Sequence, residues 1–190
     1  MRIHPAYLAA PLLSAGYGIL RLVDGIDGSR GPGPAWTAGH LAFMGALVLF
    51  VYIFREMWLM LGRSRGATAV LVAGAAGAGL AFVQFAIDVV VGFMAADHEA
   101  MGPLFDQVQA VPGVSLLVYQ AGPVLFYVAQ VVLVAMLAVR RQVPVWVPAL
   151  VLVQVLLPFV SLDLIPLGGL LALIAFLPLA VSDRRVPAHA

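Results

Sequence analysis

The chain has 190 residues, of which 63% are hydrophobic and only 10% are charged, and its formal net charge is +1. Soluble globular domains usually carry about 25% charged residues, so this composition excludes a soluble globule and predicts an integral membrane protein. The sequence contains neither Cys nor Lys, which excludes disulfides, thiol catalysis, covalent haem attachment, Schiff-base cofactors and the Lys of a nucleotide-binding loop.

Six apolar segments follow one another, separated by short polar breaks. They cover about 5–23, 37–54, 67–94, 114–139, 143–162 and 165–181. A helix needs roughly 20 residues to cross a bilayer, and the first, fifth and sixth segments are close to that minimum. The sequence therefore predicts an all-α fold, a polytopic bundle of six transmembrane helices that forms one transmembrane domain over residues 1–190.

Arginine is concentrated in alternate breaks, and this alternation predicts the orientation. One residue precedes the first segment, and the others follow the second, fourth and sixth: Arg2, Arg55, Arg63, Arg65, Arg140, Arg141, Arg184 and Arg185. The opposite breaks are acidic and contain Arg30. Because cytoplasmic loops are rich in arginine, we predict that both termini are cytoplasmic. The absence of Asn and the abundance of Ala, Gly and Arg indicate a GC-rich genome, so we expect a bacterial cytoplasmic membrane.

The N-terminal segment also allows a second interpretation. Arg2 followed by the apolar stretch 7–15 is weakly typical of a signal peptide, with Ser14-Ala15-Gly16 as the small-residue site. Pro11 lies inside this stretch and the apolar run continues to Val23, which favours a membrane span.

The third segment contains small residues at helical spacing. Gly74, Gly77, Ala78 and Ala81 would allow another helix to approach closely. This pattern predicts either a central helix of the bundle or a contact with a partner membrane protein or a second copy of the chain.

The outer break at 97–112 carries Met101, Leu104, Phe105 and Val108 at helical spacing. We predict a short amphipathic helix that acts as an interfacial anchor or as a lid over the bundle.

The strongest candidate for chemistry is Asp88, which lies in a strongly apolar stretch with Gln84 one turn away on the same face. A carboxylate within a membrane segment usually faces the bundle interior, although Asp88 could also lie at the outer interface. His40 is expected at the same membrane level, and a His–Asp pair could relay a proton or orient a substrate.

Four further polar residues are expected to line an outward-facing pocket with Asp88 and His40: Tyr17, Arg21, Gln120 and Tyr127. We expect Arg21 to pair with Asp88 rather than with Asp24. The adjacent residues Asp97, His98 and Glu99 cannot easily converge on one ion, so no metal site is predicted. Neither a cofactor nor a nucleic-acid partner is expected.

Three functions remain open. The first is the binding or transport of a small apolar or amphipathic molecule. The second is a structural or assembly subunit of a membrane complex. The third is an intramembrane enzyme that uses Asp88 as a general acid or base on a lipophilic substrate, which would require a cavity that reaches Asp88.

Overall fold

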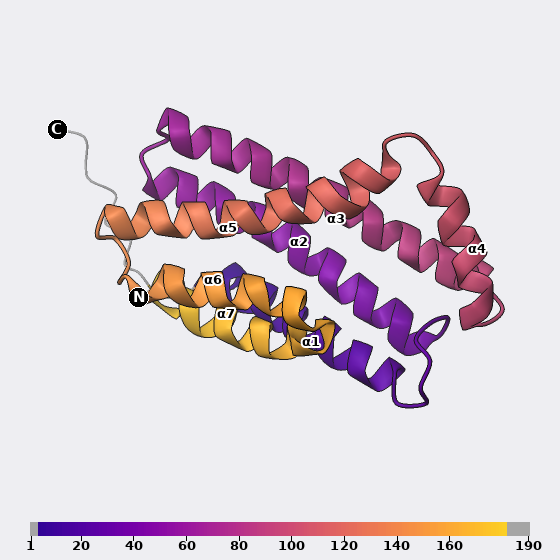
Figure 1. Cartoon of the computed structure of the whole chain (residues 1–190). Helices are drawn as coiled ribbons and strands as arrows, with labels where there is room; N and C mark the ends of the chain where they lie inside the picture. Colours follow the sequence, from indigo (N-terminus) through magenta and orange to yellow (C-terminus); the bar gives the residue numbers. More distant parts are fainter. Residues whose placement is uncertain (1–3, 182–190) are drawn as a thin grey trace.

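The computed structural model describes residues 4–181, and within them it contains helices and no strands (Figure 1). Seven helices are α-helical: α1 (Ala6–Asp24), α2 (Pro34–Met60), α3 (Arg65–Met94), α4 (His98–Gln109), α5 (Gly122–Val139), α6 (Trp146–Val160) and α7 (Ile165–Ala180). A π-helical segment, η1 (Ser115–Ala121), leads directly into α5, and a 3₁₀ turn, η2 (Leu162–Leu164), joins α6 to α7.

Local sequence signals set the helix ends. Ser64 caps α3 by accepting a hydrogen bond from the amide of Ala67, and Asp97 caps α4 in the same way from Ala100. The turn between α2 and α3 needs two residues with positive φ, and Gly62 supplies the first of them without strain.

The helices α1 and α2 pack against each other, and the remaining helices pack on either side of this pair. On one side α3 lies against α2 and α5, and on the other side α7 lies against α1. The helix α6 packs mainly on α7 and less extensively on α5. Large buried side chains such as Phe54, Phe126 and Phe176 fill the centre.

Five of the helical segments are long and apolar enough to cross a membrane: Ala6–Asp24, Pro34–Met60, Arg65–Met94, Ser115–Val139 and Leu162–Ala180. The fifth predicted segment, 143–162, corresponds to α6, which is apolar but has only 15 residues. Its length is about 22 Å, less than the roughly 30 Å of a hydrocarbon core. The structure is therefore that of a multi-pass membrane protein by helix length and composition.

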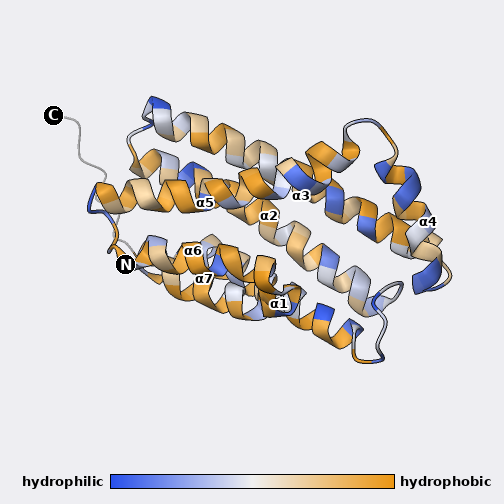
Figure 2. Ribbon diagram, viewed as in Figure 1, coloured by the Kyte–Doolittle hydropathy of each residue, from blue (hydrophilic) through white to orange (hydrophobic). Residues whose placement is uncertain are grey.

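Hydrophilic residues gather at the two ends of the bundle (Figure 2). The arginine-rich end comprises the connections at 61–64 and 140–145, and the acidic end comprises those at 25–33, 95–114 and 161–164. The terminal arginines used for the orientation, Arg2, Arg184 and Arg185, lie outside the described residues.

The small residues of α3 pack inside the bundle. Gly77 faces the backbone of α5 so closely that an added Cβ would lie 2.5 Å from the amide nitrogen of Phe126. Gly74, Ala78 and Ala81 are buried as well. The packing of α3 on α5 explains this pattern, so the face is already occupied within one chain.

The amphipathic segment of the outer break is helical as α4 and lies beside the outer end of α3 (Figure 1). Met101 is buried, and the His98 ring bonds to the carbonyl of Arg30 in the α1–α2 connection. These two contacts attach α4 to that connection.

Candidate functional site

Two ionisable side chains form a buried pair between α2 and α3. The Nε2 atom of His40 lies 3.5 Å from Oδ2 of Asp88, and the two side chains are 6% and 12% exposed. Asp88 lies six residues before the end of α3, about 9 Å of helix rise. The structure thus brings together the two residues singled out in the sequence and places Asp88 inside the bundle.

The hydrogen bonding around His40 orients its ring. The Nδ1 atom of His40 is 2.7 Å from the carbonyl oxygen of Trp36, which can only accept, so Nδ1 is the donor of this hydrogen bond. The Nε2 atom on the other side of the ring faces the Asp88 carboxyl group.

Aromatic rings surround the pair. The ring centroids of Trp36, Phe85 and Tyr17 lie 4.1, 5.1 and 5.6 Å from that of His40. Trp36 also donates its indole N–H to the backbone carbonyl of Asp88 at 3.0 Å, which joins α2 to α3. The free space beside His40 is only about 10 Å³, about the room that one water needs. An organic substrate does not fit there, so this geometry gives the enzyme hypothesis no support.

The ion pairing of Arg21 differs from the expectation. Its Nε atom lies 3.9 Å from Asp163 in η2, and it has no ion pair with Asp88 or Asp24 among the described residues. Asp163 also accepts a hydrogen bond from Arg30 at 2.9 Å. Two arginines therefore meet one acid because the α6–α7 turn lies beside the outer end of α1, a proximity that only the tertiary fold creates.

The other predicted pocket residues separate. Gln84 is half-buried and its Oε1 atom has no hydrogen-bond partner. Gln120 is exposed, whereas Tyr127 is half-buried. Their seven-residue spacing does not place them together because η1 is π-helical, and α-helical spacing does not hold across its junction with α5.

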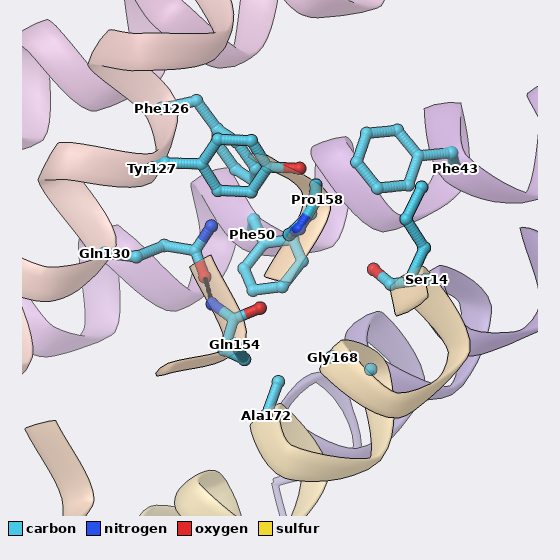
Figure 3. A pocket seen from close by; sticks show the side chains of 12 residues that line it. Ser14, Phe43, Phe50, Phe126, Tyr127, Gln130, Gln154, Pro158, Gly168 and Ala172 are labelled. Atoms are coloured by element: carbon cyan, nitrogen blue, oxygen red, sulfur yellow. Dashed lines mark hydrogen bonds between the residues drawn. The ribbon is translucent and has the colours of Figure 1, made fainter. Parts of the chain in front are cut away.

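Tyr127 belongs instead to a second polar site, a central cavity of about 30 Å³. The cavity is partly open, and α1, α2, α5, α6 and α7 all contribute to its wall. Gln154 of α6 donates to Oε1 of Gln130 of α5 at 3.2 Å, and both side chains are buried. Figure 3 shows the Tyr127 hydroxyl, both amides and Ser14 directed toward the same space.

Several polar atoms at this cavity have no partner within the described residues. The Gln130 Nε2, the Gln154 Oε1 and the Tyr127 hydroxyl make no hydrogen bond there. Gln130 and Gln154 are buried residues that line the cavity, and a water or a guest in it can bond to their polar groups. The cavity volume suffices for one or two waters.

A third hollow lies on the acidic end between the outer parts of α2 and α3. It is an open groove of about 580 Å³ with Thr37 as its one polar side chain, and its wall is otherwise apolar: Pro32, Gly33, Pro34, Ala38, Leu41, Gly92, Phe93, Ala95 and Ala96. The described residues contain no cluster of three or more His, Asp or Glu that could hold a metal ion.

Some of these residues gave no clear signal in the sequence. A tryptophan near the end of an apolar segment is typical of an interfacial anchor, but the indole N–H of Trp36 bonds to α3. Gln130 and Gln154 are polar residues within two apolar segments, and nothing in the sequence links them. Glu56 also has a buried side chain, which accepts a hydrogen bond from Arg55 at 3.0 Å. The signal in the sequence is an Arg–Glu pair between the apolar residues Phe54 and Met57.

The chain matches no known protein family, no curated protein and no solved structure. The His40–Asp88 pair and the central cavity are therefore the two features of the structure that bear on function.

Proposed function

We propose that this protein binds or transports a small amphipathic molecule within a bacterial cytoplasmic membrane, and that the polar end of this molecule enters the central cavity. One observation carries the proposal: three polar groups without partners, on Tyr127, Gln130 and Gln154, converge inside an apolar bundle. Pockets of this kind, mostly apolar with few polar groups, are typical of small-molecule sites.

The seam between α5 and α6 is the proposed entrance. The helix α6 packs less extensively on α5 than on α7, and the side-chain amide of Gln154 donates a hydrogen bond to that of Gln130 across this seam. The neighbouring surface of α6 is apolar and exposed, with Leu152, Val153 and Leu156, so a hydrocarbon tail can lie there among lipids. The open groove at the acidic end is less suitable because Thr37 alone offers a polar side chain.

Aromatic contacts join the His40–Asp88 pair to the cavity in this proposal. Phe85 packs on His40 and stacks on Phe43 at 4.6 Å, and Phe43 lines the cavity.

The proposal includes six membrane spans with both termini in the cytoplasm. The arginines of the 61–64 and 140–145 connections support this orientation. The short α6 then serves as the fifth span, and the membrane adjusts around it by thinning or by polar flanking residues.

The test uses photoreactive amphipaths, sixteen-carbon chains with a mid-chain diazirine and hydroxyl, carboxylate or methyl-ether ends. The full chain in phosphatidylcholine nanodiscs is irradiated with each probe, and the adducts are mapped by peptide mass spectrometry. At least one probe should concentrate its adducts on α5 to α7. Ala172→Val should reduce them because Ala172 lines the cavity and is buried.

Ala76→Val makes the same change on the exposed face of α3 and is the matched control. Equal labelling of all lipid-facing helices, with no effect of Ala172→Val, would reject the proposed function.

A further inference from the structure

We infer that the central cavity selects an uncharged lipid that carries a hydroxyl group, such as a long-chain alcohol. This inference rests on the proposed function, because it specifies the head group that the same cavity accepts. It follows from the charge, the hydrogen-bonding pattern and the size of the site.

The first step is charge. None of the residues that line the cavity is ionisable near neutral pH: Ser14, Phe43, Phe50, Phe126, Tyr127, Gln130, Gln154, Pro158, Ile165, Gly168, Gly169 and Ala172. A carboxylate, phosphate or ammonium group would enter without an opposite charge, and burial of an isolated ion is strongly unfavourable. The guest's polar end must therefore be neutral.

The second step is the pattern of donors and acceptors. Gln130 Nε2 is a free donor, because Oε1 of the same amide receives the bond from Gln154. The Oε1 of Gln154 is a free acceptor. Ser14 donates its own proton to the carbonyl of Ala10, so its oxygen is left to accept at this site. A hydroxyl accepts from Gln130 and donates to Gln154, whereas an ether or a ketone satisfies only the donor.

The third step is size. The free volume of about 30 Å³ holds a group as large as one or two waters. A hydroxyl on a primary carbon fits, whereas a sugar or a phosphate ester does not. Pro158 adds a further acceptor beside the site, since its lack of an N–H leaves the carbonyl of Gln154 without its helical donor.

The experiment compares the same three probes on the wild-type chain in nanodiscs, which requires no substitution. The one additional hydrogen bond, from the guest hydroxyl to Gln154, predicts about fivefold more adduct on α5 and α6 for the hydroxyl probe than for the methyl ether. The carboxylate probe should label these helices no more than the methyl ether does.

A double substitution, Gln130→Leu with Gln154→Leu, should remove the hydroxyl preference. It removes donor and acceptor together and so leaves no unpaired amide in the core. Gln120→Leu is the matched control, since Gln120 is exposed outside the cavity. Unfolding temperature and size-exclusion profile show whether each variant is folded.

The outcomes separate the two proposals. Equal hydroxyl and ether labelling, or a carboxylate preference, with adducts still lost in Ala172→Val, would overturn the hydroxyl assignment while the binding function stands. Labelling by all three probes that Ala172→Val does not change would mean that water alone occupies the cavity, and both proposals would then fail.

Discussion

Gly77 provides the sharpest test of the fold, because another glycine in the same helix serves as its control. A Cβ added at Gly77 would lie 2.5 Å from the amide nitrogen of Phe126, 2.7 Å from the carbonyl oxygen of Gly122 and 2.8 Å from Cβ of Leu125. The two closest atoms belong to the backbone of α5, so no side-chain rotation can relieve the contact. A Cβ at Gly79 would meet no atom within 4 Å.

The two substitutions Gly77→Ala and Gly79→Ala gain the same helix propensity, so the difference between them isolates the steric cost. Overpacking of a core by one methyl group costs about 1–3 kcal/mol, and contact with rigid backbone places Gly77→Ala at the upper end. We expect Gly77→Ala to lower the free energy of unfolding by about 2–3 kcal/mol relative to Gly79→Ala.

The assay is reversible unfolding of each variant in mixed micelles, followed by circular dichroism, with size exclusion to record the oligomeric state. Equal stability of the two variants would refute the close packing of α3 on α5. Dissociation of a dimer by Gly77→Ala, with monomer stability unchanged, would refute it too and would assign this face to a partner instead.

Three other predictions follow from contacts at the acidic end and from the orientation. His40→Ala should lower the free energy of unfolding by about 3–5 kcal/mol, because it leaves the buried Asp88 carboxylate unpaired. Adding Asp88→Asn should recover part of this loss in a double-mutant cycle, and strictly additive effects would show that the pair is not coupled. Arg30→Gln should cost less than about 1 kcal/mol, and high salt should abolish the difference, because the Arg30 and Asp163 side chains are 35% and 49% exposed. A larger loss that persists in salt would contradict a surface ion pair. The chain has no Cys, so each introduced cysteine is the single site that a maleimide can label. An impermeant maleimide should label Glu99→Cys in intact cells and Arg140→Cys only after permeabilisation. The reverse pattern would invert the orientation.

The helix positions could be predicted from the sequence because they depend on local hydropathy. The predicted third span, 67–94, differs from α3 (Arg65–Met94) only at its first turn, where Ser64 caps the helix. The second predicted span, 37–54, lies within α2, which begins at Pro34 and continues to Met60 beyond the charged residues Arg55 and Glu56. Charged residues limit an apolar span but not the helix that contains it.

The candidate site was predictable only in part, for a different physical reason. Asp88 and His40 are conspicuous because each is an ionisable group in an apolar segment, and equal distance from one membrane face suggested their contact. The contact of Gln130 with Gln154 and that of Arg21 with Asp163 depend on which helices are neighbours. Hydropathy carries no information on neighbours, so these contacts required the structure.

The His40–Asp88 pair and the central cavity lie at different depths in the bundle, and their side chains differ in chemistry. The ionisable pair lies about 9 Å from the acidic end of its helices, where water and lipid head groups reduce the desolvation penalty. Gln130 lies nine residues before the end of α5, about 14 Å of rise, and its level contains amides and hydroxyls. The His40–Asp88 pair is thus an ionisable site, whereas no charged side chain lines the central cavity, which in the proposed function discriminates between guests only by hydrogen bonding. An aspartate placed in the cavity by Gln130→Asp should take up a proton rather than admit a cationic amphipath, and labelling by an amine-ended probe in that variant would contradict this division.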